Sequence, residues 1–222
     1  MAKIIENLAQ IQVNIDQAKE RSNYGQPVQI IAVTKEVDVA RTAEAIDVGL
    51  LHLGENRPEG LLVKREAIQQ FANWHYIGSL QTRKVKQVIN EIDYLHSLDR
   101  LSLAEEIEKR AQHVVKCFVQ VNVSGEESKH GLTAEETIDF LHSLANMTKI
   151  EVVGLMTMAP YSDNKELIRS VFRNLKKLQQ EVVALKLPYA PCTELSMGMS
   201  NDYEIAVEEG ATFVRIGTAL VG

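Results

Sequence analysis

The chain has 222 residues, enough for one large domain or two small ones, and 45% of them are hydrophobic and 24% charged. This composition is typical of a folded globular protein and excludes a disordered chain. Acidic residues outnumber basic residues by 30 to 24, for a net charge of −6. A protein dedicated to nucleic acid would carry a basic surplus, so we expect no nucleic-acid partner.

The beginning of the chain, Met-Ala-Lys-Ile-Ile-Glu-Asn, is charged and lacks the apolar core of a signal peptide. No stretch approaches the roughly 20 apolar residues that a membrane span needs. The two cysteines, Cys117 and Cys192, lie among apolar residues, which is typical of free buried thiols. We therefore expect a cytoplasmic protein without a membrane partner.

Short apolar runs alternate along the chain with longer amphipathic segments. The first segment, residues 4–21, has the spacing of an amphipathic helix. The apolar runs predict eight strands, at residues 28–34, 50–54, 74–78, 94–97, 114–123, 151–156, 193–196 and 212–216. The amphipathic segments predict helices at residues 39–48, 59–70, 84–92, 101–112, 134–145, 165–185 and 203–209.

Strands that alternate with helices pair in parallel through right-handed crossovers. Eight such units can close into a (β/α)₈ barrel, whose usual size of ~250 residues is close to this length. A doubly wound open sheet is the alternative, but it rarely needs eight units in so short a chain. No Gly/Ser/Pro-rich linker divides the sequence. We predict an α/β protein, a single TIM-type barrel domain over residues 1–222 with an extra N-terminal helix.

The active sites of such barrels gather at the carboxyl ends of the strands. Lys35 follows the first predicted strand, and Asn56 follows the second. A lysine beside apolar walls at a barrel mouth is suited to forming a Schiff base, because desolvation lowers its pKa and frees the lone pair. The alternative is a solvated lysine that ends a strand. For Asn56 the alternative is a helix cap, with Glu59 as its capping partner and Pro58 in the first turn.

Small residues follow the seventh and eighth predicted strands. The first of these turns runs from Ser196 through Ser200 into a helix, and the second is Arg215-Ile216-Gly217-Thr218. Loops at these two places commonly hold a phosphate group, because small residues and a helix start expose main-chain N–H groups. The alternative is a plain helix cap in which Asn201 and Glu204 form a capping box.

Other features of the sequence exclude several kinds of chemistry. The six histidines lack the spacing of a metal site, so we expect no metal. His75 lies in a predicted strand, where a lone histidine is more often a hydrogen-bonded core residue than a base. The loop at residues 124–131 is either a lid or a solvated charged loop. No paired acids for glycoside hydrolysis and no Ser–His–Asp motif are found.

A series of segments, in order along nearly the whole chain, resembles the pyridoxal phosphate homeostasis proteins, which are similar to the N-terminal barrel of alanine racemases. The sequence departs from the family pattern at Pro58, where valine is usual. The matching segments are Ala32-Val33-Thr34-Lys35, Gly54-Glu55-Asn56-Arg57, Trp74-His75-Tyr76-Ile77-Gly78-Ser79-Leu80-Gln81, Val121-Asn122-Val123-Ser124 with Lys129 and Gly131, Gly154-Leu155-Met156-Thr157-Met158, Leu195-Ser196-Met197-Gly198-Met199-Ser200-Asn201-Asp202 and Val214-Arg215-Ile216-Gly217.

The resemblance implies a pyridoxal 5′-phosphate cofactor held as a Schiff base on Lys35, with Asn56 lining the site. It also implies that the phosphate is held by Ser200, the Met199 main chain, Gly217 and Thr218, and that Arg215 faces the pyridine nitrogen. A permanently protonated arginine cannot readily accept the ring proton, so the ring nitrogen stays unprotonated. The cofactor is then a poor electron sink, which weakens carbanion chemistry.

Three functions are consistent with these residues. The first is a pyridoxal-phosphate carrier in vitamin B6 homeostasis, with no catalytic residue, which passes the cofactor to apo-enzymes. The second is a small racemase-like enzyme of amino-acid metabolism, with His75 or a loop residue as base. Racemases of this fold have a β-rich second domain that supplies a tyrosine; the sequence ends at Gly222, so we expect none here. The third is a cofactor-free barrel that binds a phosphorylated metabolite, with Lys35 as an electrostatic contact.

Overall fold

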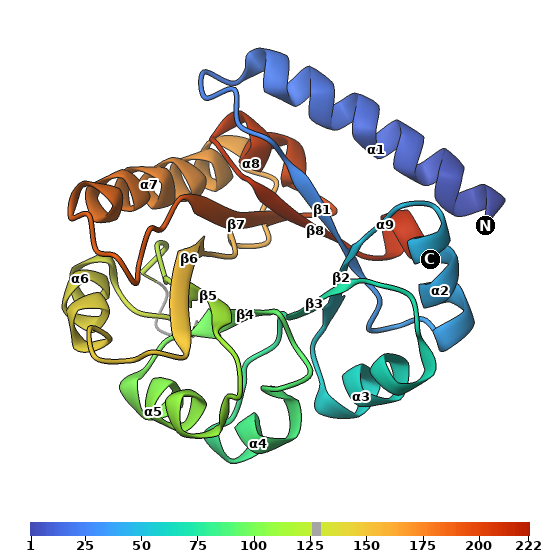
Figure 1. Ribbon diagram of the computed structural model, residues 1–222. Helices are drawn as coiled ribbons and strands as arrows, with labels where there is room; N and C mark the ends of the chain where they lie inside the picture. Colours follow the sequence, from blue (N-terminus) through green and yellow to red (C-terminus); the bar gives the residue numbers. More distant parts are fainter. Residues whose placement is uncertain (126–129) are drawn as a thin grey trace.

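The computed structural model describes residues 1–125 and 130–222 (Figure 1). Eight parallel strands close into a barrel in chain order, because β1 pairs with β2 on one side and with β8 on the other. The strands are β1 (Gln29–Val33), β2 (His52–Glu55), β3 (Asn73–Tyr76), β4 (Tyr94–Leu98), β5 (Val115–Gln120), β6 (Ile150–Met156), β7 (Glu194–Met199) and β8 (Phe213–Ile216). The predicted (β/α)₈ barrel is confirmed.

Helices surround the barrel on its outside, as Figure 1 shows. They are α2 (Val39–Asp47), α3 (Pro58–Ala67), α4 (Val85–Val88), α5 (Leu101–Arg110), α6 (Ala134–Ser143), α7 (Lys165–Ala184), α8 (Tyr203–Glu208) and α9 (Thr218–Val221), with a 3₁₀ turn at Thr82–Lys84. The extra N-terminal helix is α1 (Ala2–Arg21), which lies across α8 and α9. Asn14 of α1 donates to the Tyr203 hydroxyl over 2.8 Å, which ties α1 to α8.

Two apolar cores fill the molecule, because a parallel sheet is covered on both faces. The larger core lies between the strands and the helices and includes Trp74, Leu95 and Phe172. The smaller one lies inside the barrel, where Ile31, Phe118, Val153, Met156 and Phe213 pack together. Three histidines share this small interior core with its aromatic rings, for instance His96 stacked on Phe118 at 4.4 Å.

The structure corrects several predicted boundaries. The helix predicted at 84–92 is only the 3₁₀ turn followed by α4. The strand predicted at 114–123 ends at Gln120, since beyond it Val121 makes only an isolated bridge with Leu132. Strand β7 extends three residues beyond 196, to Met199. The four-residue helix α9 was not predicted, because four residues are too few to show a helical period.

Neither of the two capping arrangements considered as alternatives is formed. Helix α8 begins after Asp202 rather than Asn201, and no side chain caps it. Helix α3 begins after Arg57, without a side-chain cap, although Pro58 does occupy its first turn as predicted.

The cysteines are free and buried, as predicted. None of the helices in the described residues is long and apolar enough to span a bilayer. Of the loop predicted at 124–131, residues 126–129 lie outside the described part of the chain, so its role stays a prediction.

Candidate functional site

The residues singled out from the sequence lie on one arc of the rim at the carboxyl ends of the strands. In the barrel, β7, β8, β1 and β2 are consecutive neighbours, with pairs such as Met199 with Arg215 and Val33 with Gly54. Ser200 follows β7, Gly217 follows β8, and Asn56 follows β2. Lys35 lies two residues beyond the end of β1. The sequence positions are therefore brought to one side of the barrel mouth.

Lys35 is exposed, and its amine makes no hydrogen bond or ion pair with any described residue. The expectation that apolar walls enclose this lysine is not met in the structure. The amine is instead a free group in solvent at the end of β1, where a carbonyl compound could reach it.

Below Lys35 lies a buried polar cluster that was not predicted. Lys64 of α3 donates to Glu55 Oε1 over 2.7 Å and to the Thr34 main-chain oxygen over 2.5 Å. The Thr34 hydroxyl donates to the same Glu55 oxygen over 2.6 Å. Lys64 is 5% exposed and Glu55 is 1% exposed, so the ion pair is shielded from water. It fixes the residue before Lys35 to the end of β2.

On the β7–β8 side of the arc, main-chain donors are left unpaired. The N–H groups of Ser200, Gly217 and Thr218 donate to no acceptor within the described residues. Gly198 makes this turn possible: its φ is +93°, and a Cβ there would lie 2.6 Å from the Ala206 Cβ and 2.9 Å from the Tyr203 Cα. Only glycine allows α8 to pack this closely on β7. The arrangement is suited to binding an anion.

Arg215 of β8 is buried on the β7–β8 side of the arc. Its guanidinium donates to the Ser196 hydroxyl over 2.6 Å and to the Thr157 main-chain oxygen over 3.1 Å. Burial lowers the pKa of Arg215 to about 10, while the charge of Asp202 acts to raise it. The side chain is therefore protonated at neutral pH, with neutral hydrogen-bond partners only.

Asp202 lies at the start of α8, next to the turn that follows β7. Its Oδ1 accepts the Met199 N–H over 2.5 Å, which holds the end of β7 against the start of α8. Burial raises the pKa of the Asp202 carboxyl, and the Met199 N–H and the Arg215 charge oppose that shift. Its negative charge weakens the attraction of the turn for anions, but the carboxylate is already engaged with the main chain.

Asn56 and Met199 border the mouth of the barrel. Asn56 is half-buried, and Gly78 packs directly against it: a Cβ on Gly78 would lie 2.4 Å from the Asn56 main-chain oxygen. Met199, with 38% of its surface exposed, lines a cavity of about 400 Å³ with Gly78, Gln120 and Met156. A larger cavity, of about 580 Å³, lies at the opposite end of the barrel and touches none of these residues.

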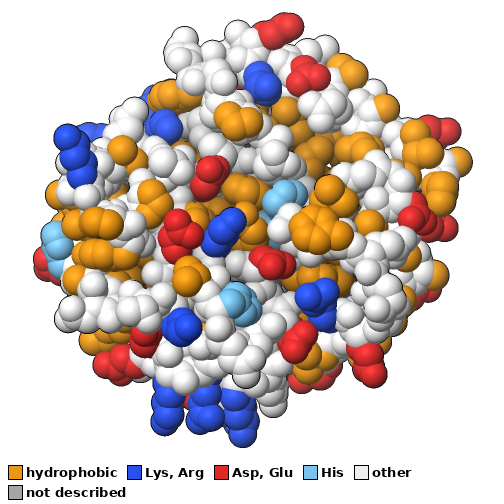
Figure 2. Space-filling model, viewed as in Figure 1, with side chains coloured by type: hydrophobic (Ala, Val, Ile, Leu, Met, Phe, Trp, Pro, Cys, Tyr) orange, Lys and Arg blue, Asp and Glu red, His pale blue; other side chains and the backbone are white. Residues whose placement is uncertain are grey.

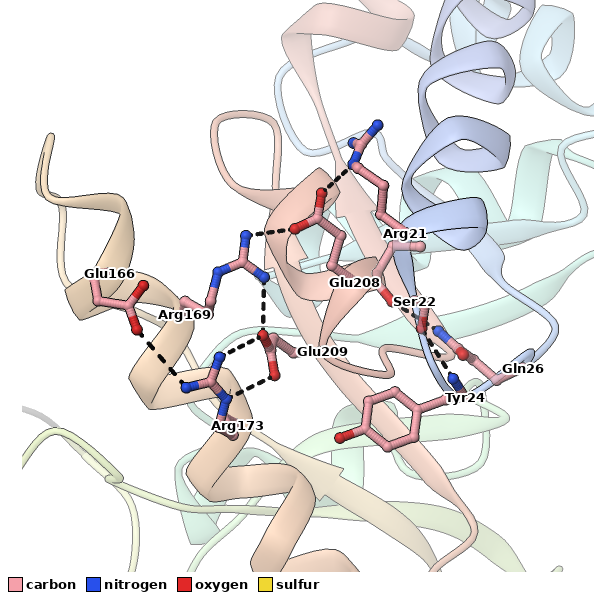
Figure 3. Close-up of polar contacts among 10 residues, drawn as sticks. Arg21, Ser22, Tyr24, Gln26, Glu166, Arg169, Arg173, Glu208 and Glu209 are labelled. Atoms are coloured by element: carbon pink, nitrogen blue, oxygen red, sulfur yellow. Dashed lines mark hydrogen bonds and ion pairs between the residues drawn. The ribbon is translucent and has the colours of Figure 1, made fainter.

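A network of ion pairs fixes α8, and with it the turn before α8, to its neighbours (Figure 3). Arg169 of α7 pairs with Glu208, the last residue of α8, over 2.5 Å and with Glu209, which follows it, over 2.9 Å. Arg21 of α1 pairs with Glu208 over 2.6 Å, and Arg173 of α7 pairs with Glu209 over 3.2 Å. Sequence reasoning missed this network, because its partners come from three separate helices.

His75 is a core residue, as predicted. It is fully buried, and its two ring nitrogens lie 2.8 Å from nitrogens of His52 and His96. An imidazole that is enclosed in the barrel, with both nitrogens engaged, does not favour the alternative hypothesis that His75 acts as a catalytic base. Among the described residues, no cluster of His, Cys, Asp and Glu has the arrangement of a metal site.

Known proteins match this chain over nearly its whole length. The family model for the N-terminal domain of alanine racemase matches residues 7–222. A pyridoxal phosphate homeostasis protein of Aquifex aeolicus is 40% identical over 225 residues, covering 98% of this chain and 96% of the relative. The protein of the same name from Escherichia coli strain K12 is 33% identical over 231 residues, covering 100% and 97%.

Solved structures support the same relationship. PipY of Synechococcus elongatus, determined with PLP bound, is 30% identical with a TM-score of 0.85, covering 99% of this chain and 100% of that one. An alanine racemase of Clostridium difficile has a TM-score of 0.79 at 14% identity, covering 99% of this chain and 59% of that one, and shares the fold alone. The chain belongs to the pyridoxal phosphate homeostasis protein family, within the larger family of alanine racemase N-terminal domains.

Proposed function

We propose that this chain binds pyridoxal 5′-phosphate in vitamin B6 homeostasis, as a single domain over residues 1–222, and holds it as a Schiff base on Lys35 without catalytic turnover. One observation carries the proposal: a free amine and a set of unpaired main-chain donors lie on the same arc of the rim, which also holds the buried cation Arg215 of β8. The three groups match the aldehyde, the phosphate and the ring nitrogen of that cofactor.

The donor set fits the cofactor in its chemistry. Lys35 would supply the amine for the aldehyde. Ser200, Gly217 and Thr218 would hold the phosphate, and the Met199 main chain would join them by exchanging its N–H bond to Asp202 for one to the phosphate. Asn56 would line the ring. When bound, pyridoxal phosphate supplies an electron sink for amino-acid chemistry. Arg215, protonated at neutral pH, would donate to the ring nitrogen and keep it from gaining a proton, so the sink stays weak. A weak sink favours a carrier over an enzyme.

The relatives support this assignment by what they are called and what one of them contains. The relatives from Aquifex aeolicus and Escherichia coli are named pyridoxal phosphate homeostasis proteins, and PipY has been solved with PLP bound. We extend both properties to this chain. Transfer to apo-enzymes that need pyridoxal phosphate, and a cytoplasmic location, are parts of the same proposal.

The test begins with the visible spectrum of the purified protein after addition of pyridoxal phosphate. We expect an absorbance band that Lys35→Ala abolishes and that Lys86→Ala, which removes an exposed lysine of α4, leaves unchanged. The loaded protein should then activate a PLP-dependent apo-enzyme in proportion to the cofactor supplied.

A second assay addresses the racemase-like alternative. Exchange of the α-proton with solvent requires only one functioning base, so it detects racemase-like chemistry even where a second base is lacking. Incubation of the loaded protein with amino acids in deuterated water should give no such exchange. Rapid exchange would overturn the carrier assignment. Absence of the absorbance band in the unmodified protein would overturn cofactor binding itself and favour the barrel for a phosphorylated metabolite.

A further inference from the structure

A line of hydrogen-bonded side chains runs through the interior of the barrel, where apolar residues normally meet. His52 Nδ1 of β2 lies 2.8 Å from His75 Nε2 of β3. His75 Nδ1 lies 2.8 Å from His96 Nε2 of β4. His96 Nδ1 lies 2.9 Å from the Ser196 hydroxyl of β7. Three adjacent strands and one across the barrel thus contribute to one continuous chain.

The two ends of this chain lie in different surroundings. At its inner end, the Ser196 hydroxyl also receives a hydrogen bond of 2.6 Å from Arg215. At its outer end, His52 is only half-buried and lines the cavity of about 580 Å³ at the amino-terminal end of the barrel, together with Leu8 and Leu50. Figure 2 shows hydrophobic side chains around a hollow beside α1, with a histidine side chain next to it.

Aromatic rings hold the imidazoles in place. His75 stacks on Tyr94 with ring centroids 4.3 Å apart and an interplanar angle of 2°. His96 stacks on Phe118 at 4.4 Å and 25°. Phe213 contacts His52 and His75 from the other side, with centroids 5.5 and 5.8 Å away. Rings packed in this way cannot turn freely, so the nitrogen-to-nitrogen contacts are fixed.

Arg215 determines the direction of the hydrogen bonds. A guanidinium can only donate, so the Ser196 oxygen accepts its proton. The hydroxyl hydrogen of Ser196 is then free to be donated to His96 Nδ1. In a neutral imidazole one nitrogen donates and the other accepts. His96 therefore carries its proton on Nε2 and donates to His75, His75 does the same toward His52, and the Nε2 of His52 points its proton outward.

The three imidazoles of this hydrogen-bonded line are uncharged at neutral pH. Burial lowers the pKa of His75 well below 6.5, and the neighbouring histidines and Lys116 add to the shift. Burial lowers the pKa of His96 in the same way, and the charge of Arg215 adds to it. At His52, burial and the Lys116 charge lower the pKa, and the Asp93 carboxylate opposes them.

We propose that Ser196, His96, His75 and His52 form a directed hydrogen-bond relay that positions Arg215 for its contact with the cofactor ring. The three histidines are positioning residues, since none of them reaches the site directly. This inference rests on the proposed function for its consequence, but the relay itself is a property of the free protein. A substitution at His52 should change the hydrogen bonding of His96, two hydrogen bonds away, and the position of Arg215 beyond it.

The first test is nitrogen NMR of the full-length protein, without cofactor, with ¹⁵N-labelled histidine. We expect His52, His75 and His96 to be neutral and protonated on Nε2 at pH 7.5. His52→Leu removes the last acceptor and should shift both ring-nitrogen signals of His96. His52→Asn keeps an acceptor near the position of Nδ1 and should leave them in place. The control is His113→Asn, at an exposed position outside the barrel. A charged or Nδ1-protonated His96, or no response to His52→Leu, would overturn the relay.

The second test measures pyridoxal phosphate binding to the same variants. His52→Leu should weaken binding roughly fivefold, a factor typical of coupling through a packed network. His52→Asn should restore it. Equal binding by all three proteins would overturn the positioning role even if the NMR result holds. If the unmodified protein binds no cofactor, the proposed function fails, while the NMR experiment still decides the relay.

Discussion

The two sides of the site are supported in opposite ways. Beneath Lys35, on the β1–β2 side, a single ion pair between Lys64 and Glu55 is enclosed in the protein. Beside Ser200, on the β7–β8 side, Arg21, Arg169 and Arg173 share Glu208 and Glu209 in a network that is partly open to solvent. The groups at the rim are similar in kind, main chain and polar side chains, but the forces that hold them are different.

This difference has a consequence for stability. Loss of one partner of a buried ion pair is strongly destabilising, because the other partner is left charged and without water. A solvated network loses little when one member is removed, because water and the remaining partners compensate. On the β1–β2 side, beneath Lys35, single substitutions should therefore lower the free energy of unfolding strongly, and salt should have little effect. On the β7–β8 side, beside Ser200, single substitutions should have a small effect that depends on salt.

The largest effect is expected for Lys64→Met. It removes the partner of a carboxylate that is 1% exposed, so the free energy of unfolding should fall by about 3–5 kcal/mol. Urea denaturation measures this loss. The double variant Lys64→Met/Glu55→Leu removes both charges and should recover most of the stability. A loss under 1 kcal/mol in the single variant would show that the pair does not support the Lys35 side.

The next largest effect is a dependence of the free energy of unfolding on pH, through the buried His75 and His96. Folding lowers the pKa of His75 and His96 below 6.5, so their contribution to stability is present above pH 6.5 and is lost as the pH falls. As the pH falls from 7.5 to 5.5, the unfolded chain takes up these protons more readily than the folded protein does. The free energy of unfolding should therefore decrease over this pH range.

Urea denaturation at both pH values tests this expectation. His96→Gln should remove about half of the histidine-dependent loss, whereas His113→Gln, at an exposed position, serves as the control. An unchanged pH dependence in His96→Gln would contradict a neutral, buried His96.

The smallest effect is expected for Arg169→Ala. Glu208 keeps Arg21 and Glu209 keeps Arg173 as partners, so the free energy of unfolding should fall by only about 1 kcal/mol. Because the network is partly open to solvent, 1 M salt should reduce the difference between the variant and the unmodified protein. Denaturation with and without salt measures both quantities. A loss as large as that of Lys64→Met would remove the distinction between the two sides.

The fold could be predicted because its signal is repeated along the chain. Apolar strands alternate with amphipathic helices eight times, and a few wrong boundaries do not change that pattern. The places where Lys35, Ser200 and Gly217 would lie followed from the same alternation, since parallel strands put their carboxyl ends on one rim. Their proposed roles came from the family resemblance, not from the spacing.

The supporting residues were harder to find because each depends on a partner that the sequence does not identify. Lys64 looks like a surface lysine of a helix, although it lies three residues after the buried Leu61 and so shares the inward side of α3. His52, His75 and His96 occupy inward positions of three successive strands, a signal that appears only after the strands are aligned. Neither of the capping alternatives is formed, since α3 begins after Arg57 and α8 after Asp202, each without a side-chain cap.

The central claim is that Lys35 is the residue that holds pyridoxal phosphate. Reduction of the loaded protein with borohydride, followed by peptide mapping, tests it most directly. We predict one cofactor adduct per chain, on the peptide that contains Lys35, and none in Lys35→Ala. An adduct distributed over several surface lysines, or one that persists in Lys35→Ala, would contradict the assignment.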